Sequence, residues 1–104
     1  MIKNGRPYTC ESTYEPDSAL ITDRPQEVQG AVFAWIHENI KPRKTPLLTR
    51  TSYGIKHIMH ADNGIYLTNN EFKDAMMICG YKPVNERALN WNYCISKRSP
   101  AFKK

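Results

Sequence analysis

Apolar residues recur at helical spacing between residues 28 and 40 of this chain, with polar residues between them. This spacing places them on one side of a helix with about 3.6 residues per turn. The helix is expected to begin near Asp23, which can cap it, because Pro25 suits a first turn and Gln26 stands three residues after the cap. It is expected to end near residue 40, since Pro42 disfavours helical geometry at the residue before it. The apolar positions are Val28, Ala31, Val32, Trp35, Ile36 and Ile40.

A second, shorter helix is predicted from residue 51 or 52 to about residue 61. Thr51 and Ser52 each carry a hydroxyl that can cap its first turn. The sequence Asp-Asn-Gly at 62–64 is typical of a turn and separates this helix from the next one. The apolar positions of the second helix are Tyr53, Ile55, Ile58 and Met59.

A third helix is predicted from about residue 69 to residue 79. Thr68 and Glu71 have the spacing of a capping box, in which the hydroxyl accepts from a backbone N–H and the carboxylate reaches back. Gly80 is expected to end the helix, because glycine adopts positive φ at little cost. The residues expected to point inward are Phe72, Ala75, Met76 and Cys79.

Apolar and polar residues alternate from 89 to 96, which is typical of a strand with one buried face. The segment 81–84 is expected to be its antiparallel partner, with Pro83 confining that partner to a sheet edge. In such a sheet Trp91 and Tyr93 pack into the core, and the alternative is that they stack on exposed bases.

Residues 1–22 contain Pro7 and Pro16 and show no helical period, so they are expected to form an extended acidic lead-in. Residues 23–96 are expected to form one domain, and residues 97–104 a basic tail. A chain of 104 residues has room for one packed core. The predicted fold class is α+β, with a three-helix core and a small antiparallel β-hairpin.

The order of these elements resembles that of the winged helix-turn-helix superfamily. In residues 64–76, a turn glycine, an apolar residue, a hydroxyl cap and apolar residues spaced four and three apart are similar to the turn and recognition helix of that superfamily. Tyr66 and Leu67 depart from the pattern, because they lengthen the usual tight turn. The match covers residues 24–96. The small, basic chain also looks like the accessory proteins of phages and mobile elements.

The resemblance implies a winged-helix-like fold whose third helix enters the major groove of duplex DNA. Its outward side chains would then be Asn69, Asn70, Lys73 and Met77. Asparagine is the natural bidentate partner of adenine, and lysine can reach guanine or phosphate. The resemblance therefore assigns base contacts to Asn69, Asn70 and Lys73.

Charge is distributed unevenly along the chain. Residues 1–40 hold three basic and six acidic groups, a net charge of −3, whereas residues 41–104 hold twelve and four, a net charge of +8. This concentration of positive charge favours a polyanion or an acidic protein as partner. Two alternatives remain: the cations are ordinary solvated groups, or the acidic lead-in covers part of them. The cations expected to hold phosphate are Arg43, Lys44, Arg50, Lys56, Lys97 and Arg98.

Residues that suggest catalysis or metal binding are few. His57 and His60 could approach one metal ion, with Asp62 or Cys79 added as a ligand, but a catalytic zinc site needs three protein ligands. Glu71 and Asp74 share a helix face, yet their places in a first helical turn account for them. We therefore expect no catalytic residues, no metal, no cofactor and no enzymatic activity.

The three cysteines are widely spaced and include no CxxC pair, which favours reduced thiols in the cytoplasm. No apolar run approaches 18 residues, and the N-terminus lacks the pattern of a secretory signal, so a membrane partner is not expected. The sequence thus favours a non-catalytic protein that binds duplex DNA in a regulatory or accessory role. The alternative is a protein-interaction module, such as a phage or mobile-element inhibitor or adaptor that acts on an acidic host protein.

Overall fold

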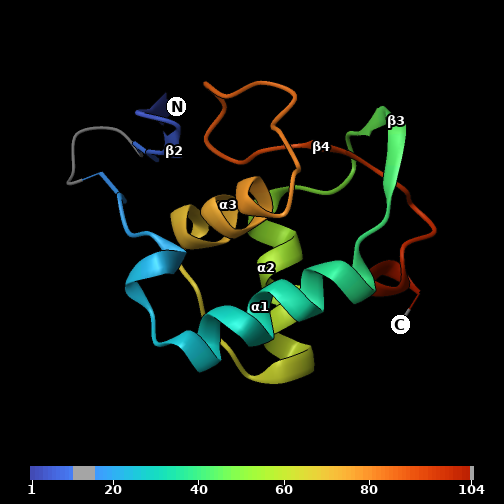
Figure 1. Ribbon diagram of the computed structural model, residues 1–104. Helices are drawn as coiled ribbons and strands as arrows, with labels where there is room; N and C mark the ends of the chain where they lie inside the picture. Colours follow the sequence, from blue (N-terminus) through green and yellow to red (C-terminus); the bar gives the residue numbers. More distant parts are fainter. Residues whose placement is uncertain (11–15, 104) are drawn as a thin grey trace.

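Three helices form the body of the protein, which a computed structural model describes for residues 1–10 and 16–103 (Figure 1). Two small antiparallel sheets of two strands each accompany them. The predicted α+β class with three helices is therefore confirmed. None of the helices in the described residues is long and apolar enough to cross a membrane. The helices are α1 (Gln26–Asn39), α2 (Ser52–Asn63) and α3 (Asn69–Ile78).

The start of α1 differs from the prediction. Asp23 does not cap this helix, because it ends the short 3₁₀ helix η1 (Ile21–Asp23), and Pro25 takes the cap position without a side-chain hydrogen bond. Along α1, Val32, Trp35 and Ile36 are buried as expected, whereas Ala31 is exposed. The predicted buried side of this helix is thus correct at the centre of α1.

The caps of α2 and α3 follow the predicted chemistry. The Thr51 hydroxyl accepts from the backbone N–H of Gly54, and α2 ends at Gly64, whose φ is 74°. Thr68 and Glu71 form the complete capping box of α3. These local signals fix both ends of the α2–α3 turn, because each satisfies backbone groups that a helix end leaves unpaired.

The main sheet joins segments that are distant in the sequence. Strand β3 (Pro42–Leu47) pairs antiparallel with β4 (Tyr93–Ile95), so the basic segment with two prolines that follows α1 is a strand. The prediction that residues 81–84 form the partner strand of β4 is wrong, because they contribute an isolated bridge between Pro83 and Tyr93. A hydrogen bond from the Val84 backbone N–H to the Asn92 carbonyl oxygen also joins the two segments.

The lead-in carries the second sheet. Strands β1 (Ile2–Lys3) and β2 (Arg6–Pro7) pair across a turn at Asn4 and Gly5, whose φ angles are 53° and 76°. Asn-Gly is the sequence that two-residue hairpin turns with positive φ favour most strongly. This hairpin packs against α3.

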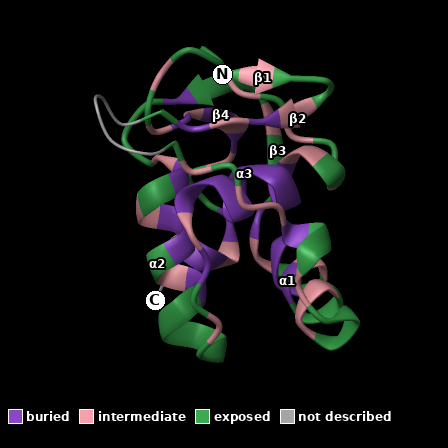
Figure 2. Ribbon diagram, turned by 90° about the vertical axis from the view of Figure 1, so that its left-hand side faces the viewer, coloured by how far each residue is buried: buried purple, intermediate pink, exposed green. Residues whose placement is uncertain are grey.

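The core lies where the three helices meet the main sheet (Figure 2). Trp91 and Tyr93 are both 0 % exposed, so the prediction that they belong to the core is confirmed. Ile36, Ile55 and Phe72 supply fully buried side chains from α1, α2 and α3. Burial of side chains of this size contributes about 1.5 to 3 kcal/mol each.

Candidate nucleic-acid interface

The helix expected to contact bases, α3, is enclosed by the rest of the protein. Asn70 and Lys73 are 0 % exposed, and Asn69 is 7 % exposed. Figure 2 shows α3 buried along most of its length. The prediction that these three side chains face outward is therefore wrong.

The side-chain amide of Asn70 is fully used inside the protein. It donates to the carbonyl oxygens of Pro7 and Ala19 at 3.1 and 2.8 Å. Its Oδ1 atom accepts from the Thr9 hydroxyl at 2.8 Å. Because all three partners belong to the lead-in, Asn70 binds the N-terminal segment to α3 and presents no free group to a base.

Asn69 and Lys73 are engaged in the same way. The Oδ1 atom of Asn69 accepts from the Ser52 hydroxyl at 2.8 Å, and its amide nitrogen donates to the Leu89 carbonyl oxygen at 3.3 Å. The ammonium of Lys73 donates to that carbonyl oxygen at 2.6 Å and to the Thr9 hydroxyl at 2.8 Å. A buried ammonium needs such acceptors, because its desolvation is costly without them.

The two acidic side chains of α3 form ion pairs with arginines that precede α1. Asp74 receives two hydrogen bonds from Arg6, at 2.8 and 2.6 Å, and Glu71 receives two from Arg24, at 2.6 and 2.9 Å. Burial by itself raises the pKa of the Glu71 carboxyl. The Arg24 guanidinium and the Thr68 backbone N–H outweigh that effect and hold this pKa below its ordinary value. The carboxylates are thus neutralised internally.

The lead-in covers part of α3, because it supplies several of these partners, among them Arg6 and Thr9. Asp17 adds a further contact at the start of the helix, where its carboxylate accepts from the Asn70 backbone N–H at 3.0 Å and from the Thr68 hydroxyl at 3.2 Å. A carboxylate there complements the positive end of the helix. The signal that sequence reasoning missed is the hairpin pair Asn4-Gly5, which gives the lead-in a folded shape.

Most of the cations predicted to hold phosphate lie away from α3, in two places. One is β3 with the residues next to it, and the other is residues 96–103, which we call the C-terminal segment. The Ser96 backbone N–H donates to the Lys41 carbonyl oxygen at 2.7 Å, and the Lys41 backbone N–H donates to the Ser99 hydroxyl at 2.9 Å. These bonds place the exposed Lys97 and Arg98 beside the start of β3. In Figure 1 the two segments run next to each other, at the side where the C-terminus lies.

A second contact joins the two segments farther along. The Arg50 guanidinium lies over the Phe102 ring, 4.6 Å from its centroid, and Phe102 ends the short helix η2 (Pro100–Phe102). Neither residues 41–61 nor residues 87–104 contain an acidic residue. We call these cations the cationic face; its exposed members are Lys41, Lys44, Arg50, Lys97, Arg98 and Lys103. Arg43 is counted with them but is half-buried, and its guanidinium donates to the Thr45 and Pro46 carbonyl oxygens.

Lys56 does not belong to the cationic face, contrary to prediction. It is 3 % exposed, and its ammonium lies 4.8 and 4.6 Å from the ring centroids of Tyr53 and Tyr66. Desolvation lowers the pKa of this ammonium, against a smaller opposite effect of Asp17. Tyr53, one of the apolar positions of the second helix, is 50 % exposed, whereas Ile55 and Met59 are fully buried.

The described part of the lead-in does not cover the cationic face. Figure 1 shows the N-terminal hairpin and the segment before α1 on one side of α3, and β3 with the C-terminal segment on the other. Both ion pairs that the described residues form with each other join Arg6 or Arg24 to α3, so they leave the cationic face charged. Glu11 and Glu15, which make the lead-in acidic, lie outside the described residues.

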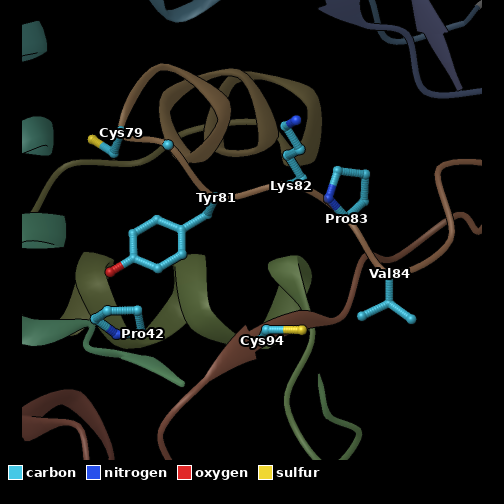
Figure 3. Close-up of a pocket in the computed structure, with 8 residues that line it drawn as sticks. Pro42, Cys79, Tyr81, Lys82, Pro83, Val84 and Cys94 are labelled. Carbon is cyan, nitrogen blue, oxygen red and sulfur yellow. The ribbon is translucent and has the colours of Figure 1, made fainter. Parts of the chain in front are cut away.

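A groove of about 490 Å³ borders the cationic face at Pro42 (Figure 3). Tyr81 crosses it, and its hydroxyl donates to the Ile40 carbonyl oxygen at 3.1 Å. Burial raises the pKa values of the Tyr81 hydroxyl and the Cys79 thiol, so both stay protonated at neutral pH. A protonated thiol is a poor nucleophile, and the lining residues of this groove include no carboxylate.

His57 and His60 form ring contacts. The His57 ring lies edge-on to Tyr53 at 4.6 Å between centroids, and the His60 ring lies edge-on to Tyr66 at 5.6 Å. Within residues 1–10 and 16–103, no three His, Cys, Asp or Glu side chains form a group that could hold a metal ion. Both histidines thus pack against tyrosine rings.

Comparison with protein-family models, with curated proteins and with solved structures finds no match to this chain.

Proposed function

We propose that this protein binds nucleic acid, duplex DNA in the first place, through phosphate contacts of the cationic face, and that it acts as a non-catalytic accessory protein of the cytoplasm. The observation that supports this proposal most strongly is the meeting of β3 and the C-terminal segment. Two stretches without acidic residues lie side by side there and carry the cations of the cationic face.

The physical basis is counterion release. Each phosphate that a lysine or arginine neutralises frees a condensed cation, so the logarithm of the binding constant falls linearly with the logarithm of the salt concentration. With about six such contacts, affinity drops about a thousandfold between about 50 and 200 mM salt. The cationic face has enough exposed groups for a dependence of this steepness.

Binding of this kind has little sequence preference. Phosphate contacts position a protein on DNA, whereas base contacts specify the site. Because Asn69, Asn70 and Lys73 are buried, α3 offers no base contact in this conformation. Random and defined duplexes should therefore bind with similar affinity.

The test is fluorescence anisotropy with a labelled duplex of about 20 base pairs, titrated at several salt concentrations between about 50 and 200 mM. The variant Lys97→Glu/Arg98→Glu is expected to bind at least about tenfold more weakly and to lower the salt slope by about 2. Both residues are exposed, so the fold should survive the change.

A matched control is Lys3→Glu/Arg87→Glu, which makes the same change in net charge at exposed positions outside the cationic face. It is expected to keep the wild-type salt slope. Equal losses in the two variants would show that only net charge matters and would reject the cationic face as the binding surface. Absence of duplex binding at about 50 mM salt would reject the proposal itself.

A second candidate function, binding of an acidic protein segment, is favoured by the open edge of β3. Among the described residues this strand pairs with β4 alone, and Arg43 and Lys44 lie along it. An extended acidic chain could add to such an edge, with its carboxylates beside the two cations. A labelled polyglutamate peptide in the same assay distinguishes the candidates: binding of the peptide without binding of the duplex would replace the first proposal by the second.

A further inference from the structure

Two tyrosines stand exposed on either side of one buried lysine. Tyr53 belongs to the first turn of α2, and Tyr66 follows the turn after α2. Their side chains are 50 % and 54 % exposed, although tyrosine is among the larger apolar side chains. The Lys56 ammonium lies within 5 Å of both ring centroids, at 4.8 and 4.6 Å. An ammonium group is attracted to the face of an aromatic ring, so Lys56 holds both tyrosine rings in place.

Two imidazoles extend this group of rings. His57 packs edge-on against Tyr53, and His60 packs edge-on against Tyr66. Both histidines are exposed. We call Tyr53, His57, His60 and Tyr66 the aromatic face. It is a surface of four rings, ordered by mutual contacts and by Lys56.

Cations and carboxylates both lie near the aromatic face. Arg50, a member of the cationic face, precedes Tyr53 by three residues, and its guanidinium lies over Phe102. Arg50 and Phe102 also line a hollow together with Ile58 and Asp62 of α2, so the C-terminal segment borders this helix. The Asp62 carboxylate accepts from the Trp35 indole N–H at 2.9 Å. The nearby carboxylate of Asp17 is occupied by hydrogen bonds from α3 and its cap. Arg50 and Tyr53 are three residues apart, a span of at most about 11 Å, so a strand with a phosphate on Arg50 can extend toward Tyr53.

We propose that the aromatic face stacks unpaired bases of a nucleic acid whose phosphates lie on the cationic face. The inference deepens the proposed function and rests on it. Bases inside a duplex are stacked on one another, so only a single strand or an unpaired extension offers a free base. The preferred ligand is thus nucleic acid with unpaired bases, and blunt duplex is bound through phosphate alone.

The aromatic face suits a base because it combines exposed rings with the positive charge of Lys56. A base stacked on an aromatic side chain contributes about 1 to 3 kcal/mol in proteins that bind single strands, and it tolerates any sequence. Lys56 lies over one side of each tyrosine ring, and an imidazole contacts each ring edge-on. About half of each tyrosine stays exposed beside these contacts. A cation behind the rings also favours a ligand that carries negative charge.

The experiment compares two labelled strands of about 20 nucleotides in the anisotropy assay at about 50 mM salt, a thymidine strand and an abasic strand with the same phosphates. Wild-type protein is expected to bind the thymidine strand at least about tenfold more tightly. Tyr53→Ala is expected to remove most of that difference and to leave affinity for the abasic strand unchanged. Tyr53→Phe, which keeps the ring, is expected to behave as wild type.

The matched control is Ile78→Ala, which truncates a side chain of similar exposure, 49 %, on α3. Thermal melting followed by circular dichroism checks that each variant folds. Equal affinity of wild-type protein for the two strands, or an unchanged preference in Tyr53→Ala, would overturn the inference while duplex binding stands. Failure of wild-type protein to bind any strand or duplex at low salt would overturn both proposals together.

Discussion

Helix α3 and the cationic face carry similar side chains in opposite environments. On α3, Lys73, Glu71 and Asp74 are buried, and each has protein partners that satisfy its charge. On the cationic face, cations such as Lys44 and Lys97 are exposed to solvent. The ion pairs within the described residues all use α3.

This contrast separates charges that stabilise the fold from charges that are free to bind. A buried polar group must be satisfied inside the protein, and its loss leaves a partner unpaired. An exposed cation keeps its hydration and contributes little to stability. Substitutions should therefore divide cleanly: those on α3 change the free energy of unfolding, and those on the cationic face change affinity.

The largest expected effect is that of Asp74→Ala. This change removes the partner of Arg6 and the acceptor of the Ile21 backbone N–H, which donates to Asp74 at 3.0 Å. Loss of one member of a buried pair costs about 3 to 5 kcal/mol, and the value should lie near 3 because the Arg6 side chain is 37 % exposed and can regain water. Urea denaturation followed by circular dichroism measures it.

The matched control for that change is Glu86→Ala, which removes the same charge at an exposed site. It should alter the free energy of unfolding by less than about 0.5 kcal/mol. A loss below about 1 kcal/mol in Asp74→Ala would mean that the lead-in does not stabilise α3 through this pair, and the contrast between the two regions would fail.

A smaller effect, with a distinct pH dependence, is expected for Glu71→Gln. The pKa of Glu71 is lowered in the folded state, so the unfolded chain binds its proton more readily. The stability that this carboxylate provides is therefore complete above its ordinary pKa of 4.5 and is lost as pH falls through the lower, folded value. At about pH 7 the variant should lose about 1 to 2 kcal/mol, because the ion pair with Arg24 becomes a neutral hydrogen bond.

Urea denaturation at about pH 7 and about pH 3 checks this sign. The difference in the free energy of unfolding between wild type and Glu71→Gln should narrow at the lower pH, because about pH 3 lies below the ordinary pKa of 4.5 and the unfolded chain then binds the proton. A gap that is constant across pH would assign the loss to the capping box with Thr68 and not to the charge of Glu71.

The helices could be predicted from the sequence because their signals are local. Thr68 and Glu71 lie within one turn, and Gly64 supplies the positive φ that the end of α2 requires. The pairing of β3 with β4 could not be predicted in this way, since about 50 residues separate the two strands. The segment 42–47 contains two prolines and shows no alternation of apolar and polar residues that would indicate a strand.

The exposure of the candidate site residues could be predicted only in part. Lys97 and Arg98 were identified by charge alone, and charge runs at a chain end are usually exposed. The burial of Asn70 and Lys73 depends on Thr9, more than 60 residues away, and no local pattern reports such a contact. Polar helix residues look alike in a sequence whether water or a distant segment satisfies them.

The smallest expected effect on stability is that of Lys97→Glu/Arg98→Glu, the same variant that should weaken DNA binding. Its free energy of unfolding should change by less than about 0.5 kcal/mol, because both side chains are exposed. The sign should favour the folded state, since the change relieves repulsion among the neighbouring cations of the cationic face. Urea denaturation in low salt measures it, and a loss of several kcal/mol would show that these cations stabilise the fold, as the charges of α3 do.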